Sequence, residues 1–389
     1  MDFELTQDQQ IFYDSVKRFA VNELADGAVD RANSDGYLWD IAARFAEMGL
    51  LGITIPESKG GIGGSLTDAV LAIQAIAEVC PRSADVVQAG NFGAIRTFAE
   101  YANADQLARF LPDLLAGKGV MSVGMSEPDA GSSVTELKTS ATPDGDDFLV
   151  NGSKVFGTNS GDAKVFLIYL RFGPGTEGIG SALIEKGTAG FEIGPGYRYM
   201  NGESWSPLYF YNCRIPKANI LLGSGGFKKQ ISGFNIERLG NAARAVAVGR
   251  KAFNEARDHA KTRRQFGRDI CEFQGLQWKF AEMQMRLEAA QLLLMRAVTR
   301  ADNDLPSAQD SALAKLACND AGFYAANEAL QIMGALGFSD DNIVQYCMRR
   351  TRGWMIAGGS TEILKNRIAE GIFERRFSQR PPKPAKDGA

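Results

Sequence analysis

The spacing of apolar residues divides the chain into three parts with different periods. From residue 1 to about 115, apolar side chains recur at steps of three and four, as in Phe12, Val16 and Phe19, which predicts amphipathic helices. Thr6 with Gln9 is typical of a capping pair that opens the first helix. The first part is therefore expected to be helical.

The second part, from about residue 118 to 228, has the pattern of strands. Residues 164–172, 180–185 and 207–213 are apolar runs separated by glycine-rich turns such as Asn151-Gly152. We expect a compact β-barrel or sandwich here. From Gly226 to about Phe377 the pattern becomes helical again, rich in Ala, Leu, Met, Glu and Arg, which predicts an antiparallel bundle.

These periods predict a chain of several domains with both α and β structure. The expected domains are an N-terminal helical domain (1–117), a central β-barrel (118–228) and a C-terminal four-helix bundle (229–380). Residues 381–389 are expected to form a disordered tail. We find no internal repeat.

Composition narrows the class of protein. The 389 residues carry a net charge of -3, so there is no basic excess to hold nucleic acid or an anionic membrane surface. The N-terminus is acidic and the apolar runs are short, which predicts a cytoplasmic protein with no membrane insertion. Five scattered cysteines and the single histidine, His259, argue against disulfides, metal sites and histidine triads.

One motif is expected to be a decoy. The segment Gly173-Pro-Gly175-Thr-Glu-Gly178 matches the GxGxxG pattern of dinucleotide-binding proteins. A second strand follows it, with no helix N-terminus to receive a pyrophosphate. We therefore interpret it as a hairpin loop.

Four motifs follow one another along almost the whole chain, and they contain side chains of the kinds that bind a flavin. They are Gly124-Met-Ser-Glu-Pro-Asp-Ala-Gly-Ser132, Lys154-Val-Phe-Gly-Thr-Asn159, Arg263-Arg-Gln-Phe-Gly267 and Gln331-Ile-Met-Gly-Ala-Leu-Gly-Phe338. A flavin requires hydrogen-bond donors, an apolar wall and positive charge near its pyrophosphate. Met125, Ser126, Phe156 and Thr158 provide the first two, and Arg263 provides the third. Taken alone, each of these residues is better explained by core packing, a turn or a solvated charge.

Together, the order and spacing of these motifs resemble the acyl-CoA dehydrogenase family. The resemblance implies FAD as cofactor and a homotetramer, or at least a dimer, in which the last two motifs reach the FAD of a neighbouring subunit. The residues that it assigns to cofactor binding are Met125, Ser126, Ser132, Phe156, Thr158, Arg263, Phe266, Gln331, Gly334, Ser360 and Glu362. Ser133, and Phe156 where tryptophan is commoner, depart from the family pattern, as do Tyr346 and Arg350.

The usual catalytic base of this family is missing. Most members carry a glutamate at the position that matches Gly358, and glycine cannot accept a proton. The long-chain and isovaleryl-CoA dehydrogenases instead carry their base immediately before the arginine that matches Arg238, and Glu237 occupies that position. We expect Glu237 to be the base, with Gly358 leaving room for it. A simpler alternative is that Glu237 is a first-turn carboxylate that favours the helix dipole; Glu362 is a rival base.

The resemblance implies a mechanism. Glu237 removes the α-proton of an acyl-CoA thioester, the backbone N–H of Gly358 helps to hold the thioester oxygen, and the β-hydrogen leaves as hydride to FAD, giving the trans-2-enoyl-CoA. Arg238 either orients the base or pairs with another helix. Electron-transferring flavoprotein is the expected electron acceptor.

Other functions remain open from the sequence. The segment around Gly358 also resembles benzylsuccinyl-CoA dehydrogenase and sulfinopropionyl-CoA desulfinase, so a non-redox enzyme that retains FAD is one alternative. In the desulfinase the carboxylate matching Glu237 is absent, which favours oxidation here. A catalytically silent homologue and a reductase working in reverse are further alternatives. Arg82 or Arg96 is a candidate partner for a second carboxylate on the substrate.

Overall fold

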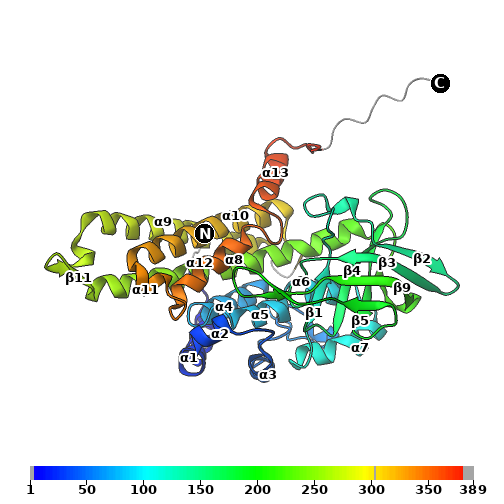
Figure 1. Cartoon of the computed structure of the whole chain (residues 1–389), viewed down its shortest axis with the longest axis horizontal. Helices are drawn as coiled ribbons and strands as arrows, with labels where there is room; N and C mark the ends of the chain where they lie inside the picture. The colour runs from blue at the N-terminus through cyan, green and yellow to red at the C-terminus, as the bar shows by residue number, and fades with distance from the viewer. Residues whose placement is uncertain (1–3, 302–303, 380–389) are drawn as a thin grey trace.

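The computed structural model describes residues 4–301 and 304–379. It contains a helical part, a sheet and a second helical part in chain order, so the predicted fold class is confirmed. Figure 1 shows the sheet at one end of the molecule and the long C-terminal helices extending toward the other end. The predicted tail, residues 381–389, lies outside the described residues.

The N-terminal part consists of short helices around a buried centre. Thr6 and Gln9 form the predicted capping box at the start of α1. Helix α4 is buried along almost its whole length, which explains why its sequence is apolar on all sides. The helices are α1 (Gln7–Leu24), α2 (Ala28–Asn33), α3 (Trp39–Glu47), α4 (Leu66–Ala77), α5 (Ala84–Asn91), α6 (Gly93–Tyr101) and α7 (Ala104–Leu115).

The central part is one eight-stranded sheet. Its hydrogen-bonded order is β10-β5-β4-β2-β3-β9-β6, with β1 pairing with β4 in parallel. The strands are β1 (Met121–Gly124), β2 (Ser140–Asp144), β3 (Asp147–Lys154), β4 (Val165–Arg171), β5 (Ile179–Glu185), β6 (Phe191–Ile193), β9 (Leu208–Pro216) and β10 (Ile220–Leu222). A separate hairpin pairs β7 (Tyr197–Arg198) with β8 (Ser204–Trp205).

The GxGxxG segment is a hairpin loop, as predicted. It joins the antiparallel strands β4 and β5, and the amide of Phe172 donates a hydrogen bond to the carbonyl of Gly178. No helix begins there, so the segment presents no helix N-terminus to a phosphate.

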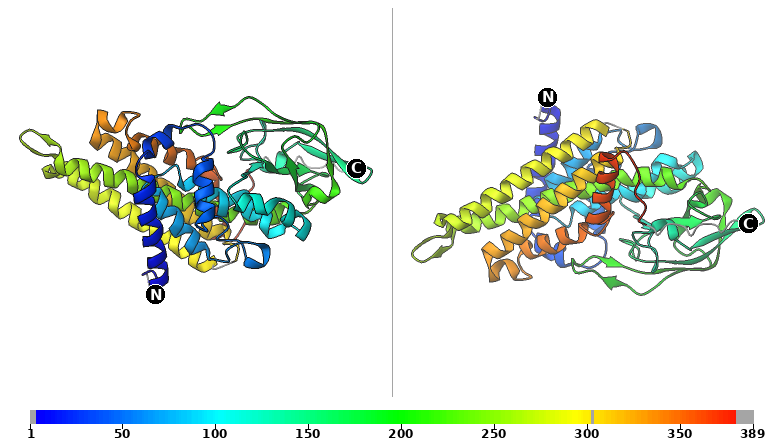
Figure 2. Two further views of the ribbon diagram at one scale, coloured as in Figure 1. Left: turned by 90° about the horizontal axis from the view of Figure 1, so that it is seen from below. Right: turned by 90° about the horizontal axis from the view of Figure 1, so that it is seen from above.

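The C-terminal part is built around α8 (Phe227–Thr262), which contacts α9 (Gln274–Ala301), α10 (Ala308–Met333) and α12 (Ile343–Trp354). Helices α11 (Ala335–Phe338) and α13 (Thr361–Ile372) complete it, and a small hairpin pairs β11 (Arg264–Gln265) with β12 (Arg268–Asp269). Figure 2 shows α8, α9 and α10 running side by side. Helix α8 also packs against α4 and α6, and the packing of α9 against α4 and of α12 against α2 adds to the contact between the two helical parts.

We keep the three domain limits as a proposal. The limit at 117/118 falls between α7 and β1, whereas the limit at 228/229 falls in the first turn of α8. Each cysteine is free, and all but Cys271 are buried. Across residues 4–301 and 304–379, none of the helices has the length and apolar character needed to cross a membrane.

Candidate active site

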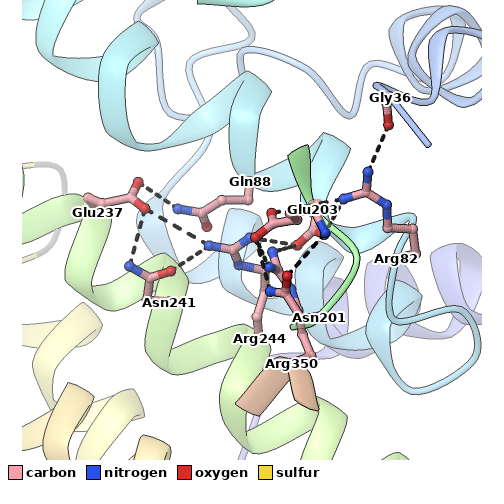
Figure 3. A network of polar contacts seen from close by, with 10 residues as sticks. Gly36, Arg82, Gln88, Asn201, Glu203, Glu237, Asn241, Arg244 and Arg350 are labelled. Atoms are coloured by element: carbon pink, nitrogen blue, oxygen red, sulfur yellow. Dashed lines mark hydrogen bonds and ion pairs between the residues drawn. The ribbon is translucent and has the colours of Figure 1, made fainter. Parts of the chain in front are cut away.

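Glu237 lies on the face of α8 that is turned toward α5 (Figure 3). The helix begins at Phe227, so Glu237 lies about three turns inside it. The alternative that Glu237 is a first-turn carboxylate is therefore wrong. A carboxylate at this depth gains nothing from the N-terminal dipole of its own helix.

Two amide side chains hold the Glu237 carboxylate. Gln88 donates from Nε2 to Oε2 at 2.7 Å, and Asn241 donates from Nδ2 to Oε1 at 3.2 Å. The guanidinium of Arg244 lies 3.9 Å from Oε1. Burial raises the pKa of Glu237, while the charge of Arg244 and the hydrogen bond from Gln88 act in the opposite direction. A carboxyl group with this balance is suited to exchange a proton.

Gly358 lies beside this group, in the turn that precedes α13. Its φ is +73°, and an ideal Cβ built on it would lie 2.9 Å from Nδ2 of Asn241 and 3.3 Å from Cε of Lys315. A larger residue at this position would displace the amide that holds Glu237. The structure therefore brings the two predicted positions, 237 and 358, to the same place.

Arg238 contacts the same turn from α8. Its Nε donates to the carbonyl oxygen of Gly358 at 3.3 Å, and its Nη1 donates to Oδ1 of Asn235 at 2.8 Å. Burial lowers the pKa of Arg238 to about 10. Of the two expected roles, its contacts fit the second: they link α8 to the turn before α13 and do not touch the Glu237 carboxylate.

Lys315 of α10 was not predicted from the sequence. Its buried Nζ donates to the carbonyl oxygens of Trp354 at 2.9 Å and Gly359 at 3.1 Å. Burial, with the charge of Arg238, lowers the pKa of Lys315 to about 7. A signal was present, because Lys315 follows the run Ser311-Ala-Leu-Ala in a helix whose other residues are mostly small and apolar.

A buried group of charges next to Glu237 was also missed. Asp85 accepts from Arg244 at 2.6 Å, from Arg350 at 2.7 Å and from Arg82 at 3.2 Å. Arg350 also pairs with Glu203, from the connection between β7 and β8. Burial opposes ionisation of Asp85, but Arg350, Arg244 and Arg82 together lower its pKa to about 2. We name these five residues the Asp85 cluster.

The Asp85 cluster explains two of the sequence observations. Arg350, which interrupts the family motif, has an ion pair with each carboxylate of the cluster. Arg82 is already paired with Asp85 and donates to the carbonyl of Gly36 at 2.8 Å. Arg96 pairs with Glu100, four residues away on α6. Both candidate arginines for a second substrate carboxylate therefore have partners within the chain.

The first group of predicted flavin residues lies together near the sheet. The amide of Val155 donates to the carbonyl of Ser126 at 2.9 Å, which joins the Met125–Ser126 segment to the segment that contains Phe156 and Thr158. The Phe156 ring is 56% exposed and lies 4.6 Å, centroid to centroid, from Trp205. Its backbone has φ +63°, which is rare for a residue with a side chain and is often found at functional sites. This exposed aromatic ring beside polar groups fits a flavin. Ser132 is exposed in the loop that follows β1.

The second group lies far from the first. Arg263 and Phe266 are exposed at the β11–β12 hairpin, and Gln331 and Gly334 are exposed at the end of α10, at the opposite end of the molecule from the sheet (Figure 1). Phe266 is 93% exposed. One chain alone therefore does not bring the two groups together, which agrees with the expectation that they serve different subunits.

Ser360 and Glu362 lie at the start of α13. The Ser360 side chain accepts a hydrogen bond from the amide of Ile363 and so caps the helix. Glu362 is exposed, and its own backbone amide and Ser360 lower its pKa. Its environment is the reverse of that of Glu237, which weakens Glu362 as a rival base.

Comparison with known proteins agrees with the fold and with this geometry. Models of the acyl-CoA dehydrogenase N-terminal, middle and C-terminal domains match residues 6–118, 122–213 and 224–373. The chain belongs to the acyl-CoA dehydrogenase family, a class of oxidoreductases. The predicted resemblance is confirmed.

Individual relatives cover nearly the full length. The chain is 32% identical to 3-sulfinopropanoyl-CoA desulfinase of Advenella mimigardefordensis, over 97% of this chain and 96% of the relative. It is 31% identical to the short-chain specific acyl-CoA dehydrogenase of Clostridium acetobutylicum, over 96% of this chain and 100% of the relative. Butyryl-CoA dehydrogenase of Megasphaera elsdenii is similar in structure, with 29% identity, a TM-score of 0.90 and coverage of 96% and 100%.

Proposed function

We propose that this protein is an FAD-dependent acyl-CoA dehydrogenase in which Glu237 is the general base. The observation that supports this most directly is the position of the Glu237 carboxylate: buried, held by Gln88 and Asn241, and next to the Gly358 turn. A base at this position compensates for the absence of a carboxylate at 358.

In the proposed reaction, the α C–H bond of the acyl thioester breaks and its proton passes to Glu237. The β-hydrogen leaves with its electron pair, and a double bond forms between the two carbons. FAD, when bound, accepts that hydride. Met125, Ser126, Phe156 and Thr158 would hold the cofactor near the sheet, and Arg263, Phe266, Gln331 and Gly334 would reach the FAD of a neighbouring subunit, with Ser132, Ser360 and Glu362 as further contacts.

The amide of Gly358 would bind the thioester oxygen as negative charge develops on it. Arg238 and Lys315 support this role, because they hold the carbonyl oxygens of Gly358 and Gly359 and so fix the turn. Electron-transferring flavoprotein as acceptor, a homotetramer and a cytoplasmic location complete the proposal.

The test is to mix the FAD-loaded enzyme, without oxygen, with acyl-CoA thioesters of different chain length. Flavin reduction is measured as the loss of oxidised flavin absorbance. Glu237→Gln should slow this reduction by roughly 10²- to 10⁴-fold without loss of FAD. Glu78→Gln is the control, because Glu78 is a poorly exposed glutamate, paired with Lys17 and distant from the site. A full rate in Glu237→Gln would exclude Glu237 as base, and a loss in Glu362→Gln alone would assign the role to Glu362.

Carbon–sulfur cleavage is the second candidate, because a desulfinase is among the similar proteins. Glu237 favours oxidation over it. The two reactions differ in one measurement: incubation with 3-sulfinopropanoyl-CoA without oxygen leaves the flavin oxidised if only the carbon–sulfur bond breaks. A catalytically silent homologue would show neither flavin reduction nor cleavage with any thioester.

A further inference from the structure

The Glu237 carboxylate lies against the first residue of α6. Gly93 begins this helix with φ +60°. An ideal Cβ built on Gly93 would lie 2.5 Å from Oε2 of Glu237 and 3.4 Å from Cδ. The distance to Oε2 is much shorter than van der Waals contact, so no residue with a side chain fits at position 93 while Glu237 keeps its conformation.

The start of α6 also suits a negative charge. The first N–H groups of a helix have no acceptor within the helix, and the N-terminus carries partial positive charge. Phe92, the residue before the helix, provides no side-chain cap. The Glu237 carboxylate therefore lies where a capping anion would be favourable, on a helix other than its own.

Groups from four helices surround the carboxylate. Gln88 comes from α5, Gly93 from α6, Asn241 and Arg244 from α8, and Lys315 from α10. Arg244 and Lys315 are the charged groups among them. Gly93 is the only one of the five that acts by lacking a side chain.

We propose that Gly93 is a positioning residue for Glu237, because its missing side chain leaves the space that holds the carboxylate at the start of α6 and beside the Gly358 turn. This inference rests on the proposed function, in which Glu237 is the base. It assigns a specific task to a residue that has no functional group of its own.

An added methyl group at position 93 could be accommodated without unfolding, so mutation can test the inference. The atoms that it would meet belong to the end of a flexible side chain and not to the backbone. The least costly relief is rotation of Glu237 away from α6, so the variant should fold with a displaced carboxylate. The positive φ adds strain of its own, which a control must share.

Gly145→Ala is that control, since Gly145 has φ +64° and nothing within 4 Å of an ideal Cβ. In the full-length, FAD-loaded enzyme, we expect the Gly93→Ala substitution to slow flavin reduction about 100-fold at saturating thioester. The thioester concentration that gives half the maximal rate should change little. Gly145→Ala should stay within about twofold of the parent. The limb of the pH profile that reports Glu237 should move to higher pH in Gly93→Ala alone, because the displaced carboxylate loses favourable partners.

A double variant tests whether the effect passes through Glu237. Glu237→Asp is shorter by one methylene, so its carboxylate should avoid the methyl group at 93. We expect Glu237→Asp to slow flavin reduction less in the Gly93→Ala background than in the parent. The two slowing factors should differ by about tenfold. Effects that simply multiply, or a Gly93→Ala rate equal to that of Gly145→Ala, would overturn the inference.

Stability gives a readout that does not depend on activity. If Gly93→Ala lowers the melting temperature strongly, adding Glu237→Ala should restore much of it, because no carboxylate then meets the methyl group. No recovery would contradict the inference. Failure of the proposed function looks different: Glu237→Gln would then reduce flavin at the full rate, whatever residue is at position 93.

Discussion

Arg238 donates a hydrogen bond from Nε to the carbonyl oxygen of Gly358 at 3.3 Å, across 120 residues of sequence. The arginine follows the proposed base, and the glycine occupies the position where most family members carry theirs. A direct hydrogen bond therefore links the two positions at which this chain departs from most of the family. The contribution of this hydrogen bond can be measured by mutation.

Arg238→Lys should weaken the Gly358 turn. Lysine keeps the charge but loses the planar guanidinium that contacts Gly358 and Asn235 together. A hydrogen bond to a charged group contributes about 1.5–3 kcal/mol, so we expect flavin reduction to slow by about tenfold or more. Stopped-flow absorbance without oxygen measures this. Arg44→Lys is the control, because Arg44 forms an exposed ion pair with Glu23, and it should leave the rate unchanged. An unchanged rate in Arg238→Lys would show that the Gly358 turn does not depend on the arginine.

Gln88→Leu should shift the pH dependence of the reaction. Base catalysis requires ionised Glu237, so the rate of flavin reduction falls as the pH falls through its pKa. Burial already raises that pKa, and the Gln88 hydrogen bond limits the rise. Removing the donor should move the acidic limb of the pH–rate profile upward by about one unit.

Gln74→Leu provides the comparison, since Gln74 forms a buried amide pair with Gln291 away from the site. This variant should lose stability and leave the limb where it is. A Gln88→Leu profile that coincides with the parent would mean that another group sets the limb.

Gly358→Ala should damage both activity and stability. The new methyl group would lie 2.9 Å from Asn241 Nδ2, and the positive φ adds strain. We expect the free energy of unfolding to fall by about 1–3 kcal/mol and flavin reduction to slow. Gly187→Ala, with φ +90° and open space around its Cβ, isolates the strain from the collision. If the two substitutions slowed flavin reduction equally, the collision with Asn241 would not be the cause of the loss.

Asp85→Asn should destabilise the fold. It removes the carboxylate that Arg82, Arg244 and Arg350 share, and breaking a buried ion pair costs about 3–5 kcal/mol. Urea unfolding at pH 7 measures the loss. Asp129→Asn, at an exposed pair with Lys138, should stay within about 0.5 kcal/mol.

The same cluster has a defined pH dependence. The pKa of Asp85 is lowered to about 2 in the fold from an ordinary value of 3.8. Its contribution to stability is therefore complete above pH 3.8 and is lost as the pH falls toward 2. The difference in stability between parent and Asp85→Asn should shrink over that interval. A difference that is constant with pH would argue that Asp85 acts through packing.

Local patterns predicted the parts of this protein that depend on neighbouring residues. The Thr6 cap, the order of helices and strands and the hairpin at Gly173 follow from short-range spacing. Motif order led to Glu237 and Gly358. The start of the second helical part near Gly226 also agrees with the first residue of α8, Phe227.

Long-range contacts were not predictable in the same way. Asp85 and Arg350 are separated by 265 residues, and neither lies in a pattern that names its partner. Lys315 binds backbone carbonyls, which carry no side-chain signature. Such contacts depend on how helices pack, and this becomes visible only when the chain is folded.

Two side chains from different helices, Arg238 on α8 and Lys315 on α10, donate hydrogen bonds to the carbonyl oxygens of Gly358 and Gly359. The carbonyl groups of two successive residues are thus held in place in the folded chain. In the proposed reaction, a thioester at this turn would meet dipoles that need no rearrangement, so little of its binding free energy would be spent on ordering the protein. The glycines let this turn lie close to Asn241 and Lys315, and the contacts from the two flanking helices limit the backbone freedom that glycines would otherwise give it.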